Sequence, residues 1–105
     1  MTDIDRGALD SGKKSVERGL DLFVSQGMVP EGERNKILER IEFTTDLKGA
    51  AEGVDLAIEA VSENPETKEK VLRELDSLLR PDAIIGSNTS TLPLPEMYPD
   101  IWPGR

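Results

Sequence analysis

The chain has 105 residues, no cysteine and no histidine, and a formal net charge of −8. The absence of cysteine excludes disulfides and thiolate metal ligands, the absence of histidine leaves carboxylates or lysines as general bases, and the negative charge argues against nucleic acid as a general partner. No apolar run has the length of a membrane span and no acidic cluster has metal-ligand spacing, so we expect a cytoplasmic protein that binds no membrane and no metal.

The first third of the chain predicts a strand end followed by a long helix. Residues 1–5 resemble the point at which a strand turns into a helix, and Asp3 or Asp5 can cap that helix. Apolar residues at helical spacing follow, and Gly27 suits the position just after the helix C-terminus. A shorter helix should open at Pro30.

The middle of the chain predicts strands around a second long helix. Residues 41–45 alternate between apolar and polar side chains and predict a short strand. Two short apolar runs, 56–61 and 83–87, are bounded by turn residues and suit buried parallel strands. Between them, Asn64 is a good N-cap and Pro65 falls at the first helical position. Five apolar residues then repeat along one helical stripe: Val71, Leu72, Leu75, Leu78 and Leu79.

A strand, a helix and a strand within about 35 residues form one right-handed βαβ unit. Sheets of this kind bind their ligands at the carboxyl ends of the strands, which here are residues 62–64 and 87–90. The pattern therefore predicts an α/β fold with a parallel sheet, and it places the candidate site at these two strand ends.

The end of the chain is rich in proline and predicts no regular element beyond a turn. Tyr98, Ile101 and Trp102 have no obvious place to be buried. We expect a partial domain over residues 1–97 and an irregular, proline-rich tail over residues 98–105.

Two sharp segments carry a resemblance to a known family. The sequence DLAIEAVSENPETKEKVLRELDSLLRPDAIIGSNTSTLPLPEM contains an EAV-x-EN segment and an SNTS segment at matching spacing. It resembles the NAD-binding domain of the 3-hydroxyacyl-CoA dehydrogenases, over residues 2 to about 97. Gly86, where the family often has alanine, and the proline-rich end depart from the pattern. The resemblance implies NAD as the cofactor and a partial Rossmann-like parallel sheet with flanking helices, its first strand missing.

The resemblance also implies parts that these residues do not contain. The family begins with a strand and a G-x-G-x-x-G loop for the dinucleotide phosphates, and neither that motif nor the family's catalytic histidine occurs here. Because the missing strand is central in the doubly wound sheet, the strands should fall into two pairs, the strand end within residues 1–5 with 41–44 and residues 56–61 with 83–87. Each pair would expose an edge, so we expect marginal stability.

Five residues are expected to have a role at the NAD site: Asp3, Glu63 and Lys68 from the resemblance, and Ala60 and Asn88 from their place at the strand ends. Asp3 matches the acid that hydrogen-bonds the adenosine ribose and favours NAD over NADP, although it could instead be a helix cap. Glu63 and Lys68 match positions near the nicotinamide ribose, although alone they resemble a helix N-terminal acid and a solvated lysine. Ala60 would let the cofactor approach the backbone, and Asn88 would shape the site at its strand end.

Ser90 matches the serine that contacts the reacting oxygen of the substrate beside the family's catalytic histidine. Without the family, a Ser-Asn-Thr-Ser run is more often a loop of side chain to backbone hydrogen bonds. Ser90 is not expected to be a nucleophile, because no suitable base accompanies it in these residues.

The leading hypothesis is a fragment of an NAD-dependent (S)-3-hydroxyacyl-CoA dehydrogenase, inactive alone. The full-length enzyme would oxidise 3-hydroxyacyl-CoA to 3-oxoacyl-CoA in fatty-acid metabolism, as a homodimer or in a multienzyme complex. One alternative is a non-catalytic truncated paralogue that acts as a binding or assembly module. Another is a different nucleotide-binding α/β protein that shares only the βαβ unit, and the two paired segments argue against it.

Overall fold

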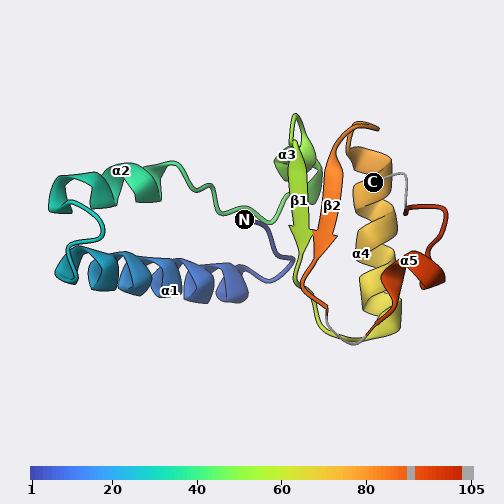
Figure 1. Ribbon diagram of the computed structural model, residues 1–105, viewed down its shortest axis with the longest axis horizontal. Helices are drawn as coiled ribbons and strands as arrows, with labels where there is room; N and C mark the ends of the chain where they lie inside the picture. Colours follow the sequence, from blue (N-terminus) through green and yellow to red (C-terminus); the bar gives the residue numbers. More distant parts are fainter. Residues whose placement is uncertain (90–91, 103–105) are drawn as a thin grey trace. The chain divides into compact units, whose positions relative to one another are not determined.

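The computed structural model describes residues 1–89 and 92–102 (Figure 1). The chain divides into two compact units, residues 1–50 and residues 51 onwards. The first contains α1 (Arg6–Ser25), a 3₁₀ turn (Glu31–Glu33), α2 (Arg34–Glu39) and most of α3 (Leu47–Ala51). The second contains β1 (Leu56–Glu59), α4 (Pro65–Leu78), β2 (Ile84–Ser87) and α5 (Leu94–Met97). Among the described residues, no helix combines the length and the apolar composition that crossing a membrane requires.

Helix α1 has the two ends that its sequence predicts. Asp5 is the N-cap, since its side chain accepts a hydrogen bond from the Gly7 N–H at 2.9 Å. The Asp3 carboxylate instead accepts the Asp5 N–H at 2.9 Å, so Asp3 does not cap the helix. Gly27 follows the C-terminus with a φ of 73°, a left-handed conformation that glycine adopts without strain, as predicted.

The two extended segments of the first unit pair less than predicted. Thr2 and Thr44 form an isolated parallel bridge, in which the Thr44 N–H donates to the Met1 carbonyl at 3.1 Å. The prediction of a strand over residues 41–45 is therefore wrong, although its pairing with the chain start is confirmed. A lone bridge gains few hydrogen bonds, because a longer strand is stable only where neighbouring strands extend the sheet.

The second unit is the predicted βαβ unit (Figure 1). β1 and β2 are parallel, in a register that sets Leu56 against Ile84 and Glu59 against Ser87. The Asn64 side chain caps α4, accepting the N–H groups of the second and third residues after it at 3.0 and 3.1 Å. Both strands are shorter than predicted by one or two residues, at the usual uncertainty of element ends.

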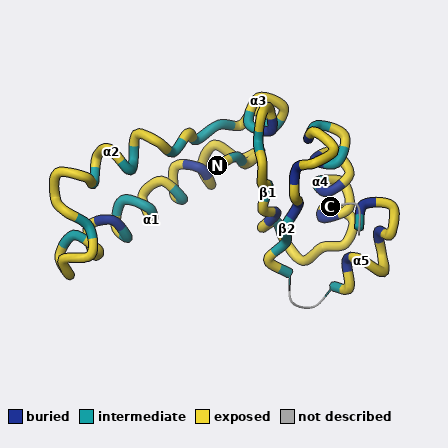
Figure 2. The backbone as a smooth tube through the Cα atoms, turned by 45° about the horizontal axis from the view of Figure 1, so that its top comes forward, coloured by how far each residue is buried: buried dark blue, intermediate teal, exposed yellow. Residues whose placement is uncertain are grey.

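The core of the second unit lies between the sheet, α4 and the end of the chain (Figure 2). Most of the predicted stripe of α4 is buried, and Tyr98 and Ile101 are 4% and 1% exposed, so the expectation that they find no place to be buried is wrong. Arg73 of α4 holds this segment, because its guanidinium lies 5.5 Å from the Tyr98 ring centroid and pairs with Asp100 at 2.6 Å. The buried apolar residues of this unit are Ala51, Leu72, Leu75, Leu79, Ala83, Ile85, Leu94, Tyr98 and Ile101.

Gly86→Ala should stabilise the protein. A Cβ added at Gly86 would lie 3.9 Å from the Ala57 carbonyl oxygen and from the Ile58 side chain, which is ordinary van der Waals contact. Since Gly86 does not have a positive φ, alanine should raise the free energy of unfolding by about 0.5–1 kcal/mol, mainly by restricting the unfolded chain. Urea denaturation at neutral pH measures the change.

Gly53→Ala is the matched control for that substitution. Gly53 has a φ of 71°, so alanine there should lower the free energy of unfolding by about 1 kcal/mol, although the space beside it is open. Equal effects of the two substitutions would contradict the assignment of Gly86 to an unstrained strand position.

Candidate functional site

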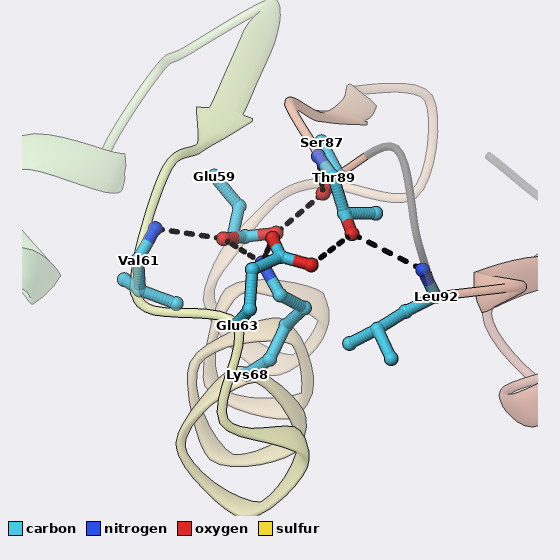
Figure 3. Close-up of polar contacts among 7 residues, drawn as sticks. All are labelled: Glu59, Val61, Glu63, Lys68, Ser87, Thr89 and Leu92. Carbon is cyan, nitrogen blue, oxygen red and sulfur yellow. Dashed lines mark hydrogen bonds and ion pairs between the residues drawn. The ribbon is translucent and has the colours of Figure 1, made fainter.

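A connected set of polar contacts lies at the carboxyl ends of β1 and β2 (Figure 3). Glu59 ends β1 and Ser87 ends β2, and the parallel register places the two opposite each other. The other members come from the loops after the strands and from α4. We call this set the carboxyl-end network, and its residues are Glu59, Val61, Glu63, Lys68, Ser87, Thr89 and Leu92.

Glu59 is the centre of the network, and its side chain is fully buried. One carboxylate oxygen, Oε2, accepts hydrogen bonds from Lys68 Nζ at 2.7 Å and from the Val61 N–H at 2.8 Å. The other, Oε1, accepts the Ser87 hydroxyl at 2.5 Å. Both oxygens therefore have donors, as a buried carboxylate requires.

Lys68 connects the buried centre to a carboxylate at the surface. Its side chain is fully buried, and its Nζ lies 3.5 Å from Glu63 Oε1 as well as beside Glu59. The Glu63 side chain is 49% exposed, and its Oε2 accepts the Thr89 hydroxyl at 2.7 Å. The network thus has a closed inner carboxylate and an open outer one, with a lysine ammonium between them.

The electrostatics of the site favour an ionised Glu59. Burial by itself raises the pKa of this carboxyl group, but hydrogen bonds from Lys68, Ser87 and the Val61 N–H, together with the charge of Lys68, outweigh that effect and lower the pKa below its ordinary value. At neutral pH the inner acid is a carboxylate. Its charge is then balanced by the ammonium that it holds.

The structure brings some of the predicted site residues together. Glu63 and Lys68 are in contact, so the alternative reading of Lys68 as a solvated lysine is wrong. Ala60 is exposed directly after β1, and the Asn88 N–H donates to the Glu59 carbonyl at 3.1 Å, which continues the strand pairing beyond β2. Both therefore lie at the predicted edge of the sheet.

The two other predicted residues are Asp3 and Ser90. Asp3 belongs to the first unit, where its side chain is exposed and its N–H donates to the Thr44 carbonyl at 3.4 Å. Ser90 falls outside the described residues. In the part of the chain that the structure describes, no group of three or more acidic side chains could hold a metal ion.

Sequence reasoning missed Glu59, whose buried carboxylate accepts three hydrogen bonds at the centre of the network. Its signal was present, because an acid closes the otherwise apolar run LAIE of a buried strand. A carboxylate at such a position needs a cationic partner, and Lys68 lies on the helix that immediately follows.

The family model of the 3-hydroxyacyl-CoA dehydrogenase NAD-binding domain matches residues 1–102. The chain belongs to this family. NAD is therefore its cofactor, and the predicted α/β class with a partial Rossmann-like sheet is confirmed. The half-exposed Glu63 carboxylate fits that cofactor, because ribose hydroxyls are hydrogen-bond donors and the acid stands at the strand ends where such folds bind dinucleotides.

Relatives of this chain include a subunit of a fatty acid oxidation complex and a 3-hydroxybutyryl-CoA dehydrogenase. The chain is 41% identical over 97 residues to the fatty acid oxidation complex subunit alpha of Idiomarina loihiensis, covering 92% of this chain and 13% of that protein. It is 38% identical over 87 residues to a 3-hydroxybutyryl-CoA dehydrogenase of Mycobacterium tuberculosis, covering 82% of this chain and 30% of that protein. The chain thus spans less than a third of the length of these curated relatives.

Solved structures show the same backbone arrangement. The crystal structure of (S)-3-hydroxybutyryl-CoA dehydrogenase from Ralstonia eutropha matches 99% of this chain and 36% of that protein, with a TM-score of 0.87 and 28% identity. That of 3-hydroxybutyryl-CoA dehydrogenase from Escherichia coli matches 90% of this chain and 20% of that protein, with a TM-score of 0.80 and 28% identity.

The buried Glu59 carboxylate should make the free energy of unfolding depend on pH in the acidic range. Because the pKa of Glu59 is lowered in the folded state, its contribution is present above its ordinary pKa of 4.5 and is lost as the pH falls through the lowered value. Glu59→Gln should lower the free energy of unfolding by about 3 kcal/mol at pH 7, and the difference from the unsubstituted protein should shrink toward pH 3. Urea denaturation at several pH values measures it.

Glu74→Gln is the control, because Glu74 is an exposed acid of α4, the helix that carries Lys68. It should change the free energy of unfolding by no more than about 0.5 kcal/mol at either pH. A Glu59→Gln difference that stayed constant from pH 7 to pH 3 would contradict the lowered pKa.

Proposed function

We propose that this chain forms the NAD-binding part of an (S)-3-hydroxyacyl-CoA dehydrogenase that oxidises 3-hydroxyacyl-CoA to 3-oxoacyl-CoA in fatty-acid metabolism. The observation that carries the proposal is the half-exposed Glu63 carboxylate at the carboxyl ends of two parallel strands, in a chain that the family model matches over residues 1–102. Parallel α/β sheets bind dinucleotides at this edge.

The residues of the chain would divide the binding of the cofactor between them. Glu63 would accept hydrogen bonds from hydroxyls of the nicotinamide ribose, and the buried Lys68 ammonium would hold the Glu63 carboxylate in place by their ion pair. Ala60 is exposed and small, so it would let the cofactor lie close to the backbone, and Asn88 would shape the opposite side. Asp3 would accept the hydroxyls of the adenosine ribose.

The substrate would be oriented by Ser90, whose hydroxyl would contact the oxygen on C3 of the hydroxyacyl thioester. NAD supplies the acceptor for the hydride that leaves C3, and the hydroxyl proton must go to a general base. These 105 residues contain no histidine, so the base would come from another part of the enzyme, and the chain alone would not turn over substrate.

Assembly of the enzyme follows from the same proposal. One relative is named as a subunit of a fatty acid oxidation complex and another as a 3-hydroxybutyryl-CoA dehydrogenase. We therefore propose that the chain works within a homodimer or a multienzyme complex. A cytoplasmic location stays a prediction.

Glu63→Gln should weaken the binding of NADH. The substitution keeps the shape of the side chain but removes a charged hydrogen-bond acceptor, so the Kd should rise about 10-fold. Titration of the chain with NADH, followed by the fluorescence of the nicotinamide, gives the Kd. Glu66→Gln is the control, because it removes an exposed acid from the first turn of the same helix and should leave the Kd unchanged. An unchanged Kd for Glu63→Gln would refute the role of Glu63.

Asp3→Asn should reduce the preference for NADH over NADPH. A carboxylate accepts hydrogen bonds from both ribose hydroxyls and repels a 2′-phosphate. The neutral asparagine should therefore lower the ratio of the affinity for NADH to the affinity for NADPH about 10-fold. The control is Asp5→Asn, since asparagine also caps helices and α1 keeps its N-cap. Equal changes in both variants would show that a general loss of negative charge is responsible.

A further inference from the structure

Glu59 is a buried acid for which the proposed reaction has no use. Its side chain is fully buried, and three donors occupy its two oxygens: Lys68 Nζ, the Ser87 hydroxyl and the Val61 N–H. A ligand at the strand ends therefore cannot reach it. Whatever Glu59 contributes, it must contribute through the groups that it holds (Figure 3).

Stability alone does not explain a buried ion pair at this position. Taking two charges out of water costs free energy that their attraction barely repays, and apolar residues of similar volume are often as stable or more so. The remainder of the unit follows that rule, with aliphatic side chains such as Leu72, Leu75 and Ile85 in its core. The charged pair occurs at the edge of the sheet where the cofactor would bind.

The geometry indicates what the pair positions. Lys68 Nζ lies 2.7 Å from Glu59 Oε2 and 3.5 Å from Glu63 Oε1, so its shorter contact is with the buried acid and its longer one is with the exposed acid. An ammonium tied to Glu59 supports Glu63 by its charge, and the half-exposed Glu63 side chain can still be reached by a hydroxyl donor. If Glu59 lost its charge, Lys68 would turn to Glu63 and compete with the ligand.

We infer that Glu59 is a positioning residue for the cofactor site. Glu59 anchors the Lys68 ammonium beside Glu63, so that the half-exposed Glu63 carboxylate can accept hydrogen bonds from the ribose hydroxyls of NAD. The inference rests on the proposed function, since it requires Glu63 to contact NAD. In this arrangement Glu59 does not contact the cofactor, and Lys68 affects cofactor binding through Glu63.

A double-mutant cycle on NADH affinity tests the inference. Glu59→Gln should raise the Kd about 10-fold in the unsubstituted chain but less than about 2-fold in a chain that already carries Lys68→Met, because the effect passes through Lys68. Ile85→Val is the stability control, since it trims a buried residue of β2 away from the polar contacts and should leave the Kd within about 2-fold.

A spectroscopic readout separates positioning from mere stabilisation. The Lys68 ammonium can be followed by nitrogen-15 NMR of labelled lysine and assigned by its loss in Lys68→Met. Saturating NADH should shift this signal in the unsubstituted chain, because engagement of Glu63 changes the field at Nζ. A pair with only a structural role would leave the signal where it was.

Each outcome decides the inference. The inference is overturned if Glu59→Gln lowers the melting temperature but leaves the Kd for NADH unchanged. It is also overturned if Glu59→Gln raises the Kd equally with and without Lys68→Met. The proposed function stands in both cases. Failure of the unsubstituted chain to bind NADH overturns both. If Glu59→Gln does not fold, the Kd for NADH is measured for Lys68→Met with and without Glu63→Gln. A change in Kd on Lys68→Met that is as large in the Glu63→Gln chain as in the unsubstituted chain overturns the role of the pair.

Discussion

The second unit depends on one constraint, which is that the charge of Glu59 must be matched inside the protein. The ammonium that matches it comes from Lys68, on the helix between the two strands, and a further donor comes from Ser87 on the second strand. All three elements of the βαβ unit therefore meet at this carboxylate. A shift in strand register or in the start of α4 would separate the donors from Glu59 and leave a buried charge unpaired.

This constraint accounts for the layered form of the carboxyl-end network. The inner acid has no exposure and a donor on each oxygen, whereas Glu63 is half-exposed and can be reached from solvent. A binding site benefits from such a division, because groups that contact a ligand bind best when packed neighbours already hold them in place. The loops after the strands then carry the contacts and the βαβ unit supplies the support.

The apolar packing around this network is small. In the second unit, Arg73 of α4 contacts Tyr98 and Asp100 near the end of the chain, where Tyr98 and Ile101 are buried. On the sheet itself, by contrast, Leu56, Ile58 and Ile84 are exposed. Since small domains bury a smaller fraction of their surface, the polar and ionic contacts carry more of the specificity here than they would in a large core.

Local chemistry in the sequence determined the helix ends, the βαβ unit and the family. A cap such as Asn64 and a stop such as Gly27 act on backbone groups a few residues away, so their effects can be predicted without the fold. The tertiary structure alone decided that Glu59 and Lys68 are buried together, that Tyr98 is buried, and that residues 41–45 form a bridge instead of a strand. Burial and strand length depend on neighbours distant in the chain, and local sequence patterns carry little information about them.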